Sequence, residues 1–237
     1  MAAAAAEPAV QSSPEEVVFR AASTARSLQK LADRGHQVAT VIDVGASNGQ
    51  WTTVARRVWP ESSALLIEAQ PCHRGALEAY CRTTPRCGFV LAAASDEPGG
   101  EVFFDDSDPF GGLASTTESG AAKTRVPTTT IDHEVRERGL VGPYLVKLDT
   151  HGYEVPILKG AEATLREASV AVIECYNFKI AEGCLLFWEM CAFMAERGFA
   201  VIDFSEPMWR QRDGAFWQMD IFFAPASSPE FSHKGYA

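Results

Sequence analysis

VATVIDVGASNG, the stretch from Val38 to Gly49, decides how this chain folds. Its apolar, β-branched first part predicts a strand over 38–44, and the acid, glycines and polar loop that follow lead into a predicted helix over 50–58. Glycines allow a tight turn with no Cβ in the way, and free N–H groups at the start of a helix favour an anionic group. The stretch therefore predicts a βαβ unit that holds a small molecule at its turn.

Composition indicates a single α/β domain. The chain has 237 residues, of which 46% are hydrophobic, enough for one well-formed core. Its 21 Lys and Arg against 31 Asp and Glu give a net charge of −10, and the basic residues are scattered along the sequence. Since phosphate binding needs a clustered positive surface, we expect no nucleic-acid partner.

The ends of the chain and its cysteines indicate a soluble, cytoplasmic protein. No apolar run approaches the roughly 20 residues of a transmembrane helix, so we expect no membrane partner. The alanine-rich segment 1–13 has no basic region and predicts a disordered tail rather than a signal peptide. Six cysteines without a C-x-x-C pair predict reduced thiols rather than a metal site.

Strand and helix patterns alternate along most of the chain, which favours a mostly parallel, doubly wound sheet. We expect one domain over 14–226, beginning with a helix over 14–35, and a C-terminal tail over 227–237. Further strands are expected at 64–67, 89–94, 144–148 and 170–173, a closing antiparallel hairpin at 199–204 and 217–224, and helices at 71–81, 155–168 and 183–196. The Gly, Ser, Thr and Asp-rich segment 105–123 interrupts the alternation and predicts either a lid over a binding site or a plain surface loop.

Polar residues follow five of the predicted strands. Ligands of open α/β sheets lie at the carboxyl ends of the strands, where these residues would gather. Each has a purely structural alternative, such as capping a loop or forming an Asx turn, but their coincidence at five strand ends favours a binding site. The residues are Asp43, Glu68, Ser95 with Asp96, the run Asp149 to Glu154, and the run Glu174 to Asn177.

Glu68 predicts an adenosine ribose. It lies about twenty residues beyond the glycine loop at the end of the next strand, where a carboxylate can accept hydrogen bonds from vicinal hydroxyls. This spacing suits both NAD and S-adenosylmethionine. The loop lacks the G-x-G-x-x-G fingerprint of dinucleotide binding, so a ligand that ends in an amino-acid carboxylate is the better match.

Several motifs together resemble the FkbM family of S-adenosylmethionine-dependent methyltransferases. They are IDVGASNGQW, LIEAQP, VLAAASDEPGGEVFF, LVKLDTHGYEVPILKGAEATL, VAVIECYN and FWQMDIFFA, which span roughly 38–224. The resemblance implies a class I methyltransferase (Rossmann-like) three-layer sandwich, whose seven-stranded, mostly parallel sheet has an antiparallel last strand. It also implies O-methylation of a hydroxyl on a sugar or secondary metabolite.

The resemblance assigns roles to the strand-end residues. Glu68 would hold the ribose, Ser95 or Asp96 would lie near the adenine, and Asp149 would lie beside the transferable methyl group. The family often has Glu or Gln where this chain has His151. The methionine end of S-adenosylmethionine would lie against Asp43, Gly45, Ala46, Ser47, Asn48 and Gly49.

His151 suggests a catalytic hypothesis. An alcohol acceptor must lose its proton, and imidazole is suited to accept a proton near neutral pH. We therefore expect His151 to be the general base, with Asp149 or Glu154 orienting it or the acceptor. The alternative is a partly exposed His151 and an Asp149 that only positions substrate.

Three questions stay open in the sequence. Asp149, Glu174 and Asn177 are hard oxygen ligands that could hold Mg²⁺, or could simply bind substrate or cap the chain. A nucleotide-binding oxidoreductase and a non-catalytic Rossmann-like domain are the alternative functions. The identity of the acceptor, a small molecule or glycan, depends on the shape of the loops 105–123 and 205–216. The oligomeric state is unknown.

Overall fold

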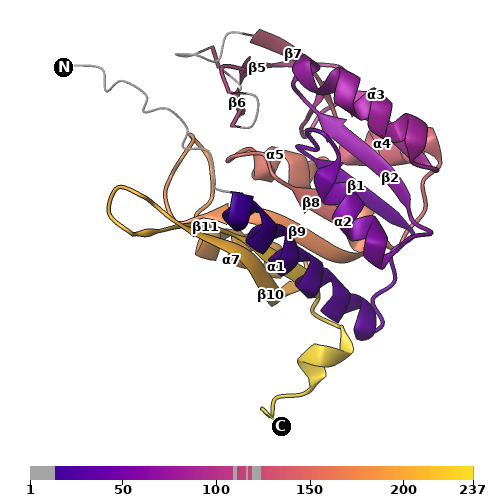
Figure 1. Ribbon diagram of the computed structural model, residues 1–237, viewed down its shortest axis with the longest axis vertical. Coiled ribbons are helices and arrows are strands. Elements are labelled where there is room, and N and C mark those ends of the chain that lie inside the picture. The colour runs from indigo at the N-terminus through magenta and orange to yellow at the C-terminus, as the bar shows by residue number, and fades with distance from the viewer. Residues whose placement is uncertain (1–13, 109–110, 116, 119–123, 237) are drawn as a thin grey trace.

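The computed structural model describes residues 14–108, 111–115, 117–118 and 124–236 (Figure 1). The disordered tail predicted at 1–13 lies outside the described residues, and so does part of the segment 105–123. Within these ranges, no helix combines the length and the apolar character needed to span a bilayer.

Strands and helices alternate through the first and last thirds of the chain (Figure 1). The helices are α1 (Pro14–Asp33), α2 (Gln50–Val58), α3 (Arg74–Thr83), α4 (Ile131–Arg138), α5 (Glu154–Lys159), α6 (Glu162–Arg166) and α7 (Phe187–Ala195), with 3-10 turns η1 (Pro71–His73) and η2 (Pro229–Ser232). The strands are β1 (Thr40–Val44), β2 (Ser63–Glu68), β3 (Cys87–Leu91), β4 (Ala93–Ala94), β5 (Glu101–Asp105), β6 (Leu113–Ser115), β7 (Thr124–Thr129), β8 (Tyr144–Leu148), β9 (Ala168–Tyr176), β10 (Phe199–Trp209) and β11 (Phe216–Pro225).

The described residues form a seven-stranded sheet in the order β10-β11-β9-β8-β1-β2-β3, in which β11 alone is antiparallel to its neighbours. The class I methyltransferase fold predicted for this chain is therefore confirmed. The register pairs Val44 of β1 with Ile67 of β2 and with Leu148 of β8. Since these three parallel strands end level with one another, the loops that follow them meet at one edge of the sheet.

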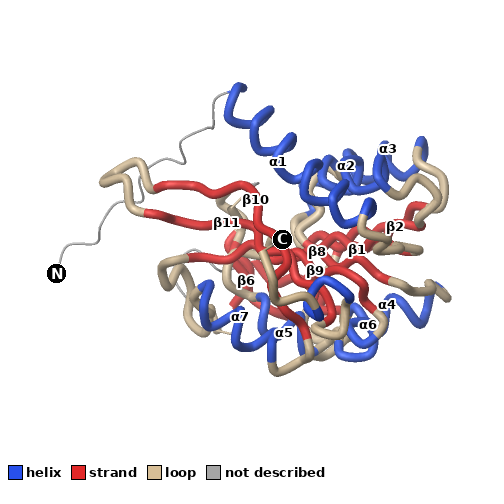
Figure 2. The backbone as a smooth tube through the Cα atoms, turned by 90° about the horizontal axis from the view of Figure 1, so that it is seen from below, coloured by secondary structure: helices blue, strands red, loops and turns tan. Residues whose placement is uncertain are grey.

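Helices cover both faces of this sheet, which explains the continuous apolar runs of its central strands. Figure 2 shows α1, α2 and α3 on one side and α4, α5, α6 and α7 on the other. Val41 and Leu145 pack with Leu28 and Leu31 of α1 in the first layer. Ile42 and Val146 face the opposite layer, where Met194 of α7 is also buried. The central strands β1 and β8 are thus buried on both faces.

A second, four-stranded sheet follows β3, in the order β4-β7-β5-β6 within the described residues. The strand expected at 89–94 therefore divides between two sheets. Leu91 pairs with Glu68 of β2, whereas Ala93 pairs with Thr128 of β7. The expected lid segment contributes β6 to this sheet, so its described part is structured.

Three other elements differ from the sequence expectation. The helix expected at 155–168 divides at Gly160 into α5 and α6, and α4 was not predicted. The hairpin strands are longer than expected, so half of the predicted loop 205–216 is β-structure. Long-range pairing extends these strands, and local sequence patterns contain no record of that pairing.

Gly160 allows a close backbone contact, which leads to a stability prediction. A Cβ at this position would lie 2.0 Å from the Ser95 carbonyl oxygen, whereas a Cβ at Gly75 in α3 would meet nothing within 4 Å. We expect Gly160→Ala to lower the free energy of unfolding by about 1–3 kcal/mol, and Gly75→Ala to raise it by about 0.5–1 kcal/mol. Urea denaturation measures both, and an unchanged stability for Gly160→Ala would contradict the packing described.

Candidate active site

A cavity opens where β1, β2 and β8 end. Its volume is about 140 Å³, below the roughly 300 Å³ at which pockets begin to enclose a drug-sized ligand, so such a ligand would extend out of its mouth. Five of the predicted site residues line it: Gly45, Ser47, Glu68, Asp149 and His151.

Gly45 brings the loops after β1 and β8 together. Its φ of 75° lies in the left-handed region, and a Cβ here would lie 2.0 Å from the Asp149 carbonyl oxygen. The Asp149 amide donates in turn to the carbonyl oxygen of Val44 at 3.0 Å. Only glycine permits this approach, so Gly45 holds the end of β1 against the start of the Asp149 loop.

Glu68 is buried and organises the turn around the cavity. One carboxylate oxygen accepts the Ser47 N–H and the other accepts the Gln70 N–H, both at 2.8 Å. Each oxygen keeps a lone pair for a further donor. The hydroxyl oxygen of Ser47 is also buried and has no hydrogen-bond partner among the described residues. Both side chains are thus available to a ligand in the cavity.

Lys147 is a charged residue in the middle of a central strand, and its side chain is 5% exposed. Its ammonium nitrogen lies 3.3 Å from Asp43 and 3.1 Å from Asp149. Burial lowers the pKa of Lys147, but the carboxylates of Asp149 and Asp43 outweigh that effect and raise it. The ammonium group is therefore charged and joins the glycine loop strand to the Asp149 loop.

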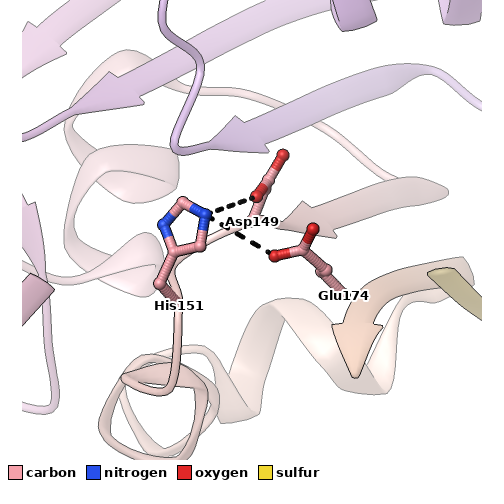
Figure 3. A group of neighbouring side chains, drawn as sticks. All are labelled: Asp149, His151 and Glu174. Carbon is pink, nitrogen blue, oxygen red and sulfur yellow. Dashed lines mark ion pairs between the residues drawn. The ribbon is translucent and has the colours of Figure 1, made fainter. Parts of the chain in front are cut away.

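The loop after β8 carries His151 into a group of three side chains (Figure 3). The Nε2 atom of His151 lies 3.7 Å from a carboxylate oxygen of Asp149 and 3.7 Å from one of Glu174. The loop reaches this position because His151 has a φ of 51° and the following Gly152 a φ of 100°. His151 is therefore a histidine between two carboxylates at the edge of the cavity.

The two carboxylates of this group differ in charge. Burial raises the pKa of Asp149, but Lys147 and then His151 outweigh it and lower the pKa to about 2. Burial and the nearby Asp149 raise the pKa of Glu174 well above its ordinary range. Tyr176 donates to one oxygen of Glu174, and the Gln218 amide donates to the other. Asp149 is thus the ionised member, and Glu174 favours its protonated form.

Glu154 and Asn177 lie outside this group. Glu154 is buried, and its carboxylate accepts the Gly152 N–H at 2.8 Å and the Thr150 hydroxyl at 3.2 Å. These hydrogen bonds hold the residues on either side of His151. The amide of Asn177 donates to the Phe216 carbonyl at 3.1 Å and secures the hairpin. Of the oxygen-ligand set expected from the sequence, Asp149 and Glu174 lie together, and His151 is the third member of their group.

The remaining predicted cofactor residues do not line the cavity. Asp43 is buried beneath the loop and accepts the Thr52 hydroxyl at 2.6 Å. Ser95 is buried against Tyr153, and Asp96 is exposed. A Cβ on Gly49 would lie 3.0 Å from the Tyr80 ring, so this glycine is a packing position. Ala46 and Asn48 are also absent from the lining of the cavity. The cofactor-binding roles assigned to these six residues stay predictions.

Sequence reasoning missed several lining residues. Ala92, Ala93 and Ala94 form a small-residue wall, and the run LAAAS after β3 was the available indication. Phe104 and Ala114 come from β5 and β6 of the second sheet. The sequence predicted a lid or a surface loop at 105–123, but no local pattern indicates which residues of this sheet line the cavity. Lys147 was also missed, although a lysine inside the apolar run YLVKL was an indication.

An aromatic row leads from His151 along the hairpin. The rings of His151 and Tyr176 are 6.4 Å apart, and Tyr176 meets Trp217 edge-on at 6.0 Å. Trp217 stacks on Phe178 at 5.3 Å, and the Arg210 guanidinium lies 4.2 Å from the Phe178 ring centre. Trp217 and Arg210 belong to the hairpin of β10 and β11, whereas Tyr176 ends β9 and Phe178 follows it. The row of rings therefore extends from His151 toward the hairpin.

Together, the strand order, the glycine loop and the strand-end acids define a class I methyltransferase. The magnesium protoporphyrin IX methyltransferase of Synechocystis, solved with bound SAM, has a TM-score of 0.52 at 9% identity over 91% of this chain and 86% of its own. The precorrin-6y C5,15-methyltransferase of Geobacter metallireducens scores 0.46 at 12% identity over 93% of each chain. No curated protein sequence matches significantly.

A family comparison matches residues 43–201 to the methyltransferase FkbM domain, which is more than half of the chain. The chain belongs to the FkbM family of methyltransferases.

The raised pKa of Glu174 predicts a dependence of stability on pH. The native state keeps a proton on Glu174 that the unfolded chain loses above the ordinary pKa of 4.5, so stability falls as pH rises from there toward the native pKa. Glu174→Gln cannot ionise, and we expect its free energy of unfolding to fall less steeply between about pH 5 and 8. Urea denaturation across this pH range measures the free energy of unfolding, and Glu61→Gln, at an exposed carboxylate, is the control. Parallel curves for all three proteins would refute the assignment.

Proposed function

We propose that this protein is an S-adenosylmethionine-dependent methyltransferase that methylates a hydroxyl group of a sugar or secondary metabolite. The observation that supports it most is that one cavity joins Gly45, Glu68 and the loop of Asp149 and His151. The family and the fold both agree with methyl transfer. A small-molecule or glycan acceptor, no nucleic-acid or membrane partner and a cytoplasmic location are part of the same proposal.

The cavity offers donors and acceptors that suit this cofactor. Glu68 keeps lone pairs for the two ribose hydroxyls, and the unpartnered hydroxyl of Ser47 is available to the amino-acid end. The small apolar side chains of Ala92 and Ala94 suit the face of a purine ring. When bound, S-adenosylmethionine supplies an activated methyl group on a positively charged sulfur.

The residues of the chain would then align the acceptor and take its proton. Methyl transfer is an in-line displacement, so fixed positions for the acceptor oxygen contribute much of the rate. His151 accepts the hydroxyl proton at Nε2, and the ionised Asp149 stabilises the imidazolium that forms. Lys147 keeps Asp149 ionised and in place. Asp149 is thus assigned the orienting role, and Glu154 supports the loop.

A divalent cation is a second route to the same activation. The ligand atoms of Asp149, His151 and Glu174 all lie within 4.8 Å of one another, and two oxygens and one imidazole nitrogen form a donor set for such ions. The cation would lower the pKa of the acceptor hydroxyl in place of a protein base. Activity that survives exhaustive chelation would exclude this route.

Cofactor binding tests the class of enzyme. We expect calorimetry to detect binding of S-adenosylmethionine and not of NAD(H), because the dinucleotide fingerprint is missing. Glu68→Gln should weaken S-adenosylmethionine binding by roughly 10-fold or more, because hydrogen bonds to a charged group contribute about 1.5–3 kcal/mol. The exposed Glu61→Gln is the matched control. Binding of NAD(H) alone would favour the oxidoreductase. Binding of neither S-adenosylmethionine nor NAD(H) would favour a non-catalytic domain.

Turnover tests the role of His151. Release of S-adenosylhomocysteine across a panel of glycosides and hydroxylated metabolites would identify an acceptor. With that acceptor we expect His151→Ala to lower kcat by about 10²–10⁴-fold, the usual contribution of general base catalysis, while S-adenosylmethionine affinity stays within about 2-fold, because the cavity residues that bind it are unchanged. His233→Ala, in the exposed C-terminal segment, is the control. Near-wild-type turnover of His151→Ala would eliminate the general-base assignment.

A further inference from the structure

We propose that Cys81 and Cys87 are a redox-active thiol pair that closes to an intrachain disulfide. Their Sγ atoms lie 2.8 Å apart, closer than two unbonded sulfur atoms ordinarily approach. A disulfide bond is about 2.05 Å long, so a shift of under about 1 Å would bring the two atoms to bonding distance. The two cysteines are not among the residues that line the candidate active-site cavity.

The fold places these two thiols face to face. Cys81 lies in the last turn of α3, and Cys87 is the first residue of β3. The chain reverses between them, helped by the left-handed φ of 55° at Arg86. Both cysteines are partly buried, whereas Cys175 and Cys184 are fully buried. Cys81 and Cys87 are therefore the adjacent pair that a small reagent can reach.

A surface cavity gives access to the pair. Its volume is about 670 Å³, and its lining includes both cysteines. Arg82, Arg86 and Arg138 line the same cavity, in a protein whose net charge is −10. Arg86 pairs with Glu61 and Arg138 pairs with Glu134, which offsets part of this positive charge. The carboxylates of a small disulfide such as oxidised glutathione suit the lining arginines.

The exchange reaction balances with such a disulfide as oxidant. Burial, and next the hydrogen bond with Cys81, raise the pKa of the Cys87 thiol, so we assign the first attack to Cys81. The Cys81 thiolate attacks one sulfur of the reagent and releases one thiol. The Cys87 thiolate then attacks Cys81 in the mixed disulfide and releases the second thiol. Two protein thiols are oxidised, and one small disulfide is reduced to two thiols.

The disulfide would fix the end of α3 beside the glycine loop. Tyr80 precedes Cys81, its ring packs against Gly49, and its hydroxyl lies 3.3 Å from that of Thr53 in α2. A covalent link from Cys81 to β3 therefore restrains the residue that supports Gly49. Oxidation would act on the fold next to the cofactor loop without touching the cavity itself.

Peptide mapping of the full chain tests the pair without any cofactor or acceptor. The reduced protein is incubated with oxidised glutathione, alkylated under denaturing conditions and digested with trypsin without reduction. Trypsin cleaves after Arg82 and Arg86, so the peptides of Cys81 and Cys87 remain together only through a disulfide. We expect to detect the two peptides linked to each other, with a mass lower by two hydrogens than the sum of the two reduced peptides. Because the link closes a short loop, we also expect a thermal midpoint roughly 5 °C higher.

Variants distinguish this pair from general oxidation. Cys81→Ser and Cys87→Ser should each abolish the linked peptides and the thermal shift, while Cys72→Ser, at an exposed thiol, should keep both. Full alkylation of Cys81 and Cys87 in the wild-type chain after this treatment would overturn the proposal. A link from either residue to another cysteine would overturn it too. Since S-adenosylmethionine is absent, neither result depends on the proposed function.

Discussion

The ammonium group of Lys147 is the interaction on which the site depends. A buried charge is stable only when it is paired, and Lys147 is paired with Asp43 below the glycine loop and with Asp149 beside the cavity. Its main chain lies in β8, between β1 and β9, so the charge joins adjacent strands where their loops diverge. Removing it would leave the buried carboxylate of Asp43 without its charged partner, next to the partly exposed carboxylate of Asp149. The position of one side chain thereby joins the glycine-loop side of the cavity to its Asp149 side.

The same charge gives the nearby acids different states. Asp149 stays ionised because Lys147 is adjacent, and Glu174 is pushed toward its protonated form because Asp149 is ionised. Two carboxyl groups with opposed environments are a common arrangement for acid and base chemistry. His151 lies 3.7 Å from each of them, so it is placed between a charged and a neutral neighbour. The proposed proton transfer uses this asymmetry.

The fold class could be predicted from the sequence, because the glycine loop and the alternation of apolar runs are local patterns and the motifs resemble one family, whereas the order of the strands comes from the structure. The site could be predicted only in part. Glu68 and Asp149 end predictable strands, but β9 continues past Ile173 to Tyr176 by pairing with β11, which is distant in sequence. That extension brings Glu174 to the cavity edge and directs Asn177 to Phe216. The contacts of Lys147 also join residues about a hundred positions apart, which no local pattern records.

The second sheet has a consequence for how this protein can change over evolutionary time. It supplies Phe104 and Ala114 to the cavity, and among the described residues its strands form a sheet separate from the seven strands whose ends carry Gly45, Glu68 and Asp149. Substitutions at the cavity-lining residues of the second sheet can therefore leave the strand pairing of the central sheet in place. They act through packing, because Val102, Phe104 and Val126 lie in one core with Ile42 and Val44. Related chains can thus diverge in ligand preference and keep the same chemistry.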